Sequence, residues 1–259
     1  MPALIFDCDG VLADTERDGH LPAFNATFKH FDLPVCWSEE EYAQKLTIGG
    51  GKERLKSLLT PEFIGAAHLP TDPEGLSDTV ASWHAYKTGV YTDLVADGVM
   101  PGRPGIARIV TAAHEAGWTL AVASTSHEDS VRAVLEHAVG EDMAAHFSVF
   151  AGDIVVKKKP APDIYLLALQ ELAVPVDDAV VVEDSANGLR AAVAAQLRTV
   201  VTVSSFTGEE DFTGASLVVS SLGDSPEPAA SVLANPRDIS VDHEVTLDVL
   251  TQILTTPRR

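Results

Sequence analysis

Short apolar runs alternate with helix-like patterns along most of the chain. The runs that predict strands cover residues 3–6, 119–123, 148–151, 179–182, 198–203 and 217–219. Helical spacing of apolar residues between these runs predicts helices at 104–116, 128–139, 163–173 and 187–195. Runs such as Val180-Val181-Val182 are typical of strands that are buried on both faces. The pattern therefore predicts an α/β fold built on a Rossmann-like parallel sheet.

The interval 15–91 interrupts this alternation, because it shows helical spacing and no convincing strand. We expect an inserted all-helical domain at 15–91 and an α/β core formed by 1–14 and 92–259. Turn signals at Pro101-Gly102 and Pro104-Gly105 follow the expected return of the chain to the core. Near the end, a Gly- and Pro-rich loop precedes an expected helix at 246–254, and the segment 223–241 receives no function.

Composition and charge narrow the possible partners. The chain has 259 residues and a formal net charge of -20, which disfavours binding to nucleic acid or to an anionic membrane. Two cysteines fit a reducing compartment, and no apolar window is long enough to span a bilayer, so we expect a cytoplasmic protein. An anionic substrate would need a metal ion and local cations to reverse the field of the acidic chain.

The strongest chemical signal is Asp7-Cys8-Asp9-Gly10, directly after the first predicted strand. Ligands bind at the carboxyl ends of the strands in open α/β sheets, where Asp7 and Asp9 can project toward the same site. Gly10 allows the chain to leave tightly. The alternative is an ordinary turn at the end of a strand, since Asp-Gly is common in turns.

A second acidic pair, Glu183-Asp184, follows the strand predicted at 179–182. Two pairs of carboxylates at two strand ends repel each other unless a cation joins them, and Mg²⁺ prefers such oxygen ligands. The alternative is a helix N-cap at Asp184 or Ser185, which explains one of these residues but not both pairs.

Two further clusters could hold a phosphate group. Ser124, Thr125 and Ser126 follow the strand predicted at 119–123, and hydroxyl and backbone N–H groups at a helix N-terminus bind phosphate well. Lys159 lies beside Pro160, which stiffens the chain and can fix the ammonium near the carboxylates. The alternatives are an N-cap at Ser126 and a solvated lysine run at 157–159.

In this order, the four clusters resemble the haloacid dehalogenase superfamily, and Asp9 resembles the acid of its phosphotransferase branch. The resemblance implies that Asp7 is the nucleophile and that Asp9 is the general acid and base. It also implies that Mg²⁺ is held by Asp7, the backbone carbonyl of Asp9 and Asp184, with Glu183 acting through water. Ser124 and Lys159 would hold the phosphoryl oxygens. The helical insertion would be the type-1 cap of this superfamily, which closes over the site.

Two places in the insertion are candidates for substrate binding. Gly50 and Gly51 precede Lys52 and Arg54, and a mobile loop of this kind can bring cations and backbone N–H groups to an anion. The alternative is a flexible helix start with both cations in solvent. Glu16 and His20 are four residues apart, so they share one helical face and could bind sugar hydroxyls. The alternative for Glu16 is a solvated first turn.

The residues around Glu16, His20 and the glycine loop also resemble the CbbY group, whose members are phosphatases of xylulose 1,5-bisphosphate. This resemblance implies a Mg²⁺-dependent phosphatase that acts on a small sugar bisphosphate, with Lys52 and Arg54 clamping the second phosphate. The alternatives are a phosphomutase of the β-phosphoglucomutase type and a non-catalytic sugar-phosphate-binding protein. A monomer is the expected state of the chain.

Overall fold

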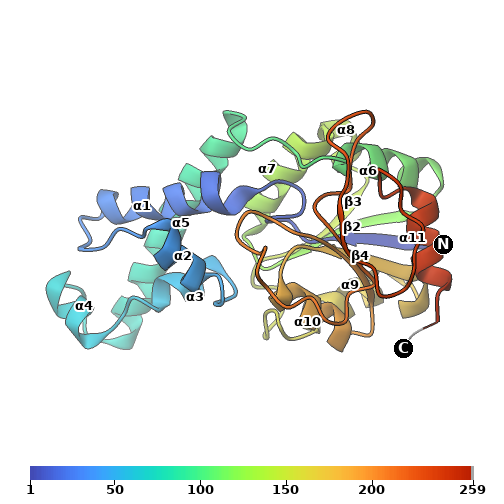
Figure 1. The fold of residues 1–259 in the computed structure, drawn as a ribbon. Helices are drawn as coiled ribbons and strands as arrows, with labels where there is room; N and C mark the ends of the chain where they lie inside the picture. Colours follow the sequence, from blue (N-terminus) through green and yellow to red (C-terminus); the bar gives the residue numbers. More distant parts are fainter. Residues whose placement is uncertain (258–259) are drawn as a thin grey trace.

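A seven-stranded sheet forms the centre of the molecule in the computed structural model, which describes residues 1–257 (Figure 1). The strand order is β3-β2-β1-β4-β5-β6-β7, and all neighbours are parallel except β6 and β7. The strands are β1 (Ala3–Phe6), β2 (Thr119–Ser124), β3 (Phe147–Ala151), β4 (Ala179–Glu183), β5 (Arg198–Thr202), β6 (Leu217–Val219) and β7 (Val232–Ala234).

Helices cover both faces of this sheet, because successive side chains of a strand point to opposite faces. Leu4 and Phe6 of β1 pack in one apolar cluster, whereas Ala3 and Ile5 pack in another. The first face is covered by α6 (Ile106–Glu115), α7 (Glu128–Val139), α8 (Glu141–Ala144) and α11 (Leu247–Thr255). The second face is covered by α9 (Asp163–Leu172) and α10 (Ala186–Ala194), with the 3₁₀ turn η2 (Val176–Asp178) between them. This is the three-layer arrangement that parallel sheets require.

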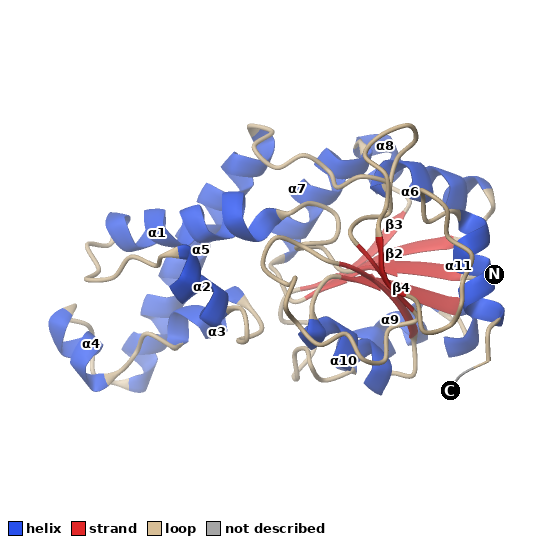
Figure 2. Cartoon of the chain, viewed as in Figure 1, coloured by secondary structure: helices blue, strands red, loops and turns tan. Residues whose placement is uncertain are grey.

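The inserted segment is entirely helical among the described residues and lies beside the core (Figure 2). Its elements are the π-helical turn η1 (Glu16–His20), α1 (Leu21–His30), α2 (Glu39–Lys45), α3 (Gly51–Lys56), α4 (Pro61–Ala66) and α5 (Pro73–Ala96). We call this segment the cap. Its own apolar cluster includes Phe24, Phe28, Trp37 and Trp83, so the cap has a hydrophobic core of its own.

Local sequence explains where several cap helices begin. Ser38, Thr60 and Asp72 are the N-caps of α2, α4 and α5, and the side chain of each accepts a hydrogen bond from a backbone N–H in the first turn. Ser38 and Glu41 also form a reciprocal capping box. These contacts satisfy backbone donors that a helix start would otherwise leave unpaired.

The predicted fold class is confirmed: the sheet is mostly parallel, helices flank it, and a helical cap is inserted after β1. Strand β7 was not predicted, because its three residues are exposed and pair only with β6, at the edge of the sheet. Helix α5 continues through the expected return point at Tyr91 and ends at Ala96. Within residues 1–257, no helix has the length and apolar character needed to cross a bilayer.

Candidate active site

The order of the strands brings the predicted chemical residues to one edge of the sheet. Strand β1 lies between β2 and β4, with Phe6 in register with both Val122 and Val182. Asp7 directly follows Phe6, and its backbone N–H donates to the carbonyl of Val182 at 2.9 Å. Since all three strands are parallel, their carboxyl ends lie together, and this places Asp7 among the strand-end residues of β2 and β4.

Three carboxylates converge at this edge. Each of Asp7, Glu183 and Asp184 offers one ligand oxygen, and these oxygens lie within 4.8 Å of one another. Burial, together with the neighbouring carboxylates, raises the pKa of Asp184 well above its usual value. Two glycines make room for the cluster, because a Cβ at Gly10 would lie 2.0 Å from Asp184 Oδ2 and one at Gly188 would lie 2.0 Å from the Glu183 carboxylate. A buried set of oxygen ligands with this spacing fits a divalent cation.

Lys159 is the cation of this cluster. Its Nζ lies 2.7 Å from Asp7 Oδ1 and 2.7 Å from Glu183 Oε1, and Tyr165 donates to the same Glu183 oxygen. Burial raises the pKa of Asp7 to about 7. The Glu183 and Asp9 carboxylates add to this upward shift, and the Lys159 ammonium opposes it. The structure therefore places Lys159 beside Asp7, as the sequence predicts. The alternative prediction of a solvated lysine is wrong for Lys159, because its side chain is buried.

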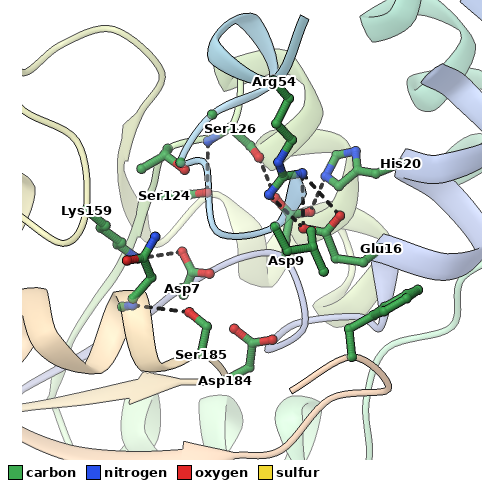
Figure 3. A pocket seen from close by; sticks show the side chains of 18 of the residues that line it. Asp7, Asp9, Glu16, His20, Arg54, Ser124, Ser126, Lys159, Asp184 and Ser185 are labelled. Atoms are coloured by element: carbon green, nitrogen blue, oxygen red, sulfur yellow. Dashed lines mark hydrogen bonds and ion pairs between the residues drawn. The ribbon is translucent and has the colours of Figure 1, made fainter. Parts of the chain in front are cut away.

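The Asp9 side chain turns toward the cap rather than toward the carboxylate cluster (Figure 3). Its Oδ1 accepts a hydrogen bond from Thr15 at 2.6 Å and lies 2.7 Å from His20 Nε2, while Ser126 donates to Oδ2. Burial alone would raise the pKa of Asp9, but His20 and these hydrogen bonds hold it well below its usual value. These contacts therefore favour the ionised form of Asp9.

Lys87 belongs to the same chain of hydrogen bonds and was missed by the sequence analysis. Its Nζ lies 2.5 Å from His20 Nδ1. A charged lysine can only donate, so Nδ1 accepts and the proton of the neutral imidazole lies on Nε2, facing Asp9. Burial lowers the pKa of Lys87 to about 8, although Asp9 and Glu16 oppose this shift. A signal was present in the sequence: Lys87 lies four residues from both Trp83 and Tyr91, on the buried stripe of α5.

Glu16, Tyr42 and Arg54 form a second polar group on the cap side. Tyr42 donates to Glu16 Oε2 at 2.5 Å and accepts from Arg54 Nη1 at 2.8 Å, and Arg54 Nη1 lies 3.4 Å from Glu16 Oε2. Burial would lower the pKa of Arg54, but the Glu16 carboxylate beside it raises the pKa above its usual value. Glu16 and His20 both lie inside the π-helical turn η1 and are buried, so neither is part of a solvated first turn. Tyr42 was not predicted as a site residue.

The two predicted cations of the cap loop point in different directions. Arg54 lines the cavity between cap and core, together with Gly50 and Gly51. Lys52 is not among the described residues that line this cavity, and its Nζ pairs with Asp153 of the core. The predicted contact between Lys52 and a substrate therefore stays a prediction.

The hydroxyl residues after β2 lie beside the acidic residues. Ser124 is buried at the end of β2, and Ser124, Thr125 and Ser126 all line the cavity. The N-cap of α7 is His127, which leaves the Ser126 hydroxyl free to donate to Asp9. At β4, Ser185 caps α10 through the N–H of Gly188, so capping does not occupy Asp184.

The cavity enclosed by these groups measures about 350 Å³, which suits a small metabolite. Figure 3 shows Asp7, Lys159 and Asp184 on one side of it, and Asp9, Glu16, His20 and Arg54 on the other. Phe206, which follows β5, also lines the cavity and packs against the cap cluster, with its ring 6.0 Å from that of Tyr42. Phe206 was another residue that the sequence analysis missed.

Comparison with known proteins assigns this arrangement to a family. The family model of haloacid dehalogenase-like hydrolases matches residues 1–196. The chain belongs to this family. A CBBY-like protein of Arabidopsis thaliana is 45% identical over 87% of this chain and 70% of the relative. The CbbY protein of Cupriavidus necator is 42% identical over 88% of each chain.

A solved structure resembles this haloacid dehalogenase-like hydrolase in both sequence and fold. A variant of CbbY from Rhodobacter sphaeroides, in complex with xylulose 1,5-bisphosphate, is 41% identical with a TM-score of 0.76, and the match covers 85% of this chain and 95% of the other. Together with the family match, this similarity indicates that the hydrolase is a phosphatase. The predicted family is thereby confirmed, and a non-catalytic binding protein is not supported.

Proposed function

We propose that this enzyme hydrolyses a small sugar bisphosphate, xylulose 1,5-bisphosphate, through an aspartyl-phosphate formed at Asp7. The observation that carries the proposal is a cavity with a cationic side chain at each of two poles. At one pole Lys159 lies 2.7 Å from Asp7, and at the other Arg54 lines the cap side of the same cavity. The similarity to a CbbY structure that holds xylulose 1,5-bisphosphate supports this substrate.

The proposal includes Mg²⁺ as the cofactor. Asp7 and Asp184 would hold the ion, with the backbone carbonyl of Asp9 as a further ligand and Glu183 acting through water. The buried carboxylates within 4.8 Å of one another fit this role. When bound, Mg²⁺ would neutralise the phosphoryl oxygens so that a carboxylate can approach phosphorus.

The chain's own residues would carry the reaction in two steps. First, a carboxylate oxygen of Asp7 forms a bond to phosphorus, the bond from phosphorus to the sugar oxygen breaks, and Asp9 gives its proton to that oxygen. Second, the Asp9 carboxylate takes a proton from water, the water oxygen bonds to phosphorus, and the bond to Asp7 breaks. Ser124 and Lys159 would hold the phosphoryl oxygens in both steps.

Asp9 must alternate between a protonated and an ionised form in this scheme. Its hydrogen bond to His20, at 2.7 Å, would pass it the Nε2 proton while Lys87 gives a proton to Nδ1, so that the imidazole keeps one proton and Lys87 becomes neutral. Lys87 would fix the imidazole by donating to its other nitrogen at 2.5 Å. Because His20 and Lys87 belong to the cap, the proton would be correctly placed only when the cap covers the site.

The second phosphate of the substrate would bind at the cap. Arg54 would bind it through guanidinium N–H groups beyond those that contact Glu16 and Tyr42, and Gly50 and Gly51 line the cavity beside it. Glu16, Thr125 and Ser126 are the remaining candidates for contact with the sugar or its phosphates. Lys52 would join them only if its Nζ left Asp153.

We expect a cytoplasmic monomer. The net charge of -20 disfavours binding to nucleic acid or to an anionic membrane. Sedimentation of the purified chain would measure its mass in solution, and a dimer would overturn this expectation.

The test of the proposed function is phosphate release from xylulose 1,5-bisphosphate, with and without Mg²⁺, against a panel of sugar monophosphates. Asp7→Asn should lower turnover at least about 1000-fold while binding of the bisphosphate persists in calorimetry. Asp18→Asn, in the exposed part of the cap, is the matched control. Equal rates on monophosphates would refute the bisphosphate preference, and glucose 6-phosphate formed from β-glucose 1-phosphate would point to a phosphomutase. Turnover retained by Asp7→Asn would exclude the proposed nucleophile.

A further inference from the structure

Four charged residues of alternating sign join the cap to the core. Lys52 and Glu53 come from α3 of the cap, and Asp153 and Lys158 come from the segment that follows β3. Lys158 Nζ lies 3.0 Å from Glu53 Oε2 and 3.0 Å from Asp153 Oδ1, and Lys52 Nζ also pairs with Asp153. We call these four residues the cap–core ion network.

The backbone of the cap loop approaches the core closely at the same place. A Cβ at Gly49 would lie 2.9 Å from the carbonyl oxygen of Lys159, and one at Gly50 would lie 2.8 Å from Lys158 Nζ. Such distances are too short for a side chain, so the glycines allow the cap loop to lie directly against the Lys159 carbonyl and the Lys158 side chain. The cap–core ion network therefore adds side-chain ion pairs where the backbone of the cap loop already contacts the core.

Lys158 connects this contact to the chemistry of the site. The next residue, Lys159, reaches in the other direction and places its Nζ 2.7 Å from both Asp7 and Glu183. Two neighbouring lysines thus hold the same stretch of backbone from two sides, one through the cap and one through the carboxylates. In the sequence alone, Lys158 is one member of the lysine run at 157–159.

We propose that Lys158 is a positioning residue that couples closure of the cap to the placement of Lys159 beside Asp7, an inference that rests on the proposed phosphatase function. Glu53 is the cap residue that pairs with Lys158, and Asp153 of the core holds the Lys158 side chain close to Glu53. Closure would bring Arg54, His20 and Lys87 over the cavity at the same time, because they belong to the same cap.

The exposure of the network sets the size of the expected effect. The side chain of Lys158 is 15% exposed and that of Glu53 is 35% exposed, so the pair is partly shielded from solvent. The side chain of Asp153 is 53% exposed. Pairs of this kind contribute modestly to equilibria, so we expect changes of a few-fold rather than loss of activity.

The inference also assigns a role to Lys52. As a member of the network it would favour the closed cap rather than bind the second phosphate. Lys52→Ala should then lower kcat/KM by a similar factor, about twofold to threefold, for a bisphosphate and for a sugar monophosphate. An effect confined to the bisphosphate would overturn the assignment of Lys52 to the network.

The kinetic test is a double-mutant cycle on kcat/KM with Glu53→Gln, Lys158→Met and the double variant. Lys158→Met should lower kcat/KM about threefold to tenfold, as the loss of two partly exposed ion pairs implies. The double variant should be no worse than Lys158→Met, because the pair can be broken only once. The matched control is Lys157→Met at the exposed neighbouring position, which should behave as the wild type. Multiplicative effects in the double variant would overturn the coupling.

A second test measures closure without turnover. Cys36 is exposed in the cap and Cys8 is buried, so a spin label at Cys36 can be combined with one at Glu115→Cys on the core. With Mg²⁺ and inorganic phosphate, the labelled protein that keeps Lys158 should give one short label distance, and the same protein with Lys158→Met should add a population at longer distance. An unchanged distribution in Lys158→Met would overturn the inference. Failure of the wild type to hydrolyse any bisphosphate would instead refute the proposed function, so the two failures are distinguishable.

Discussion

Lys87 and Asp9 contact opposite nitrogens of the same imidazole. His20 Nδ1 lies 2.5 Å from Lys87 Nζ, and His20 Nε2 lies 2.7 Å from Asp9 Oδ1. Lys87 and His20 come from two different cap elements, and Asp9 comes from the core. The imidazole tautomer that faces Asp9 is therefore set by a lysine of the cap.

Replacing Lys87 should impair the chemical step more than binding. In Lys87→Met the imidazole loses its donor at Nδ1, so its orientation and its proton are no longer fixed toward Asp9. We expect kcat to fall about 10-fold to 100-fold with a smaller change in KM, as for loss of a general acid–base partner. Steady-state kinetics measure both, with Lys56→Met on the exposed side of the cap as the control. An unchanged kcat would exclude a role for Lys87.

The same variant should stabilise the fold at neutral pH. The pKa of Lys87 is lowered from 10.5 to about 8, so the folded state binds fewer protons than the unfolded state between these values. Below about pH 8, the buried charge of Lys87 therefore lowers the free energy of unfolding. This loss disappears as the pH rises toward 10.5. The gain in unfolding free energy of Lys87→Met should shrink by about 3 kcal/mol between pH 7 and pH 10.5. Urea unfolding of both proteins measures it; a gain that does not change with pH would contradict the expected shift.

Mg²⁺ should stabilise the protein, and more at pH 8 than at pH 5.5. The pKa of Asp7 is raised from 3.8 to about 7, so in the folded state its ionised form is disfavoured, and the resulting loss of stability is complete above pH 7. A cation among the carboxylates would offset this cost of the ionised form, whereas below pH 7 protons compete with the cation for Asp7. At 100 times its dissociation constant, Mg²⁺ should add about 2.7 kcal/mol. Thermal unfolding measures the gain, which should be lost in Asp184→Asn; an equal gain at both pH values would argue against a site at Asp7.

Arg54 should discriminate between substrates with one and two phosphates. Arg54→Ala removes a charged donor from the cavity, so kcat/KM for a bisphosphate should fall about 10-fold to 100-fold, mainly through KM. A small artificial phosphate ester should be affected little, because it does not reach the cap pole. Arg17→Ala is the matched control, since Arg17 is exposed and pairs with Glu39. Equal losses on both substrates would remove Arg54 as the clamp of the second phosphate.

The core of the site could be predicted because the pattern of strands determines it. Once β1, β2 and β4 are recognised as parallel strands, Asp7, Ser124 and Glu183 must lie at one edge of the sheet. The sheet itself was predictable for the same reason, since its central strands are apolar and buried. Strand β7 could not be predicted, because three exposed residues carry no periodicity.

The cap side of the site depends on packing that a single sequence does not reveal. Tyr42 and Phe206 come from the cap and the core and meet only in the folded chain. The different directions of Lys52 and Arg54 had a local reason, because residues two apart on a helix do not share a face. That rule predicts that only one of the two cations faces the cavity, although it does not say which one.

Helix α5 has a practical consequence for exchanging caps between relatives. Its first half packs within the cap through Val80 and Trp83, while Tyr91 and Val95 belong to the apolar cluster between the sheet and helices α6 and α7. A chimera joined at Tyr91 would therefore divide one continuous hydrophobic surface between two parents. A junction placed after Ala96 keeps the whole helix with its donor and leaves only a loop to be matched.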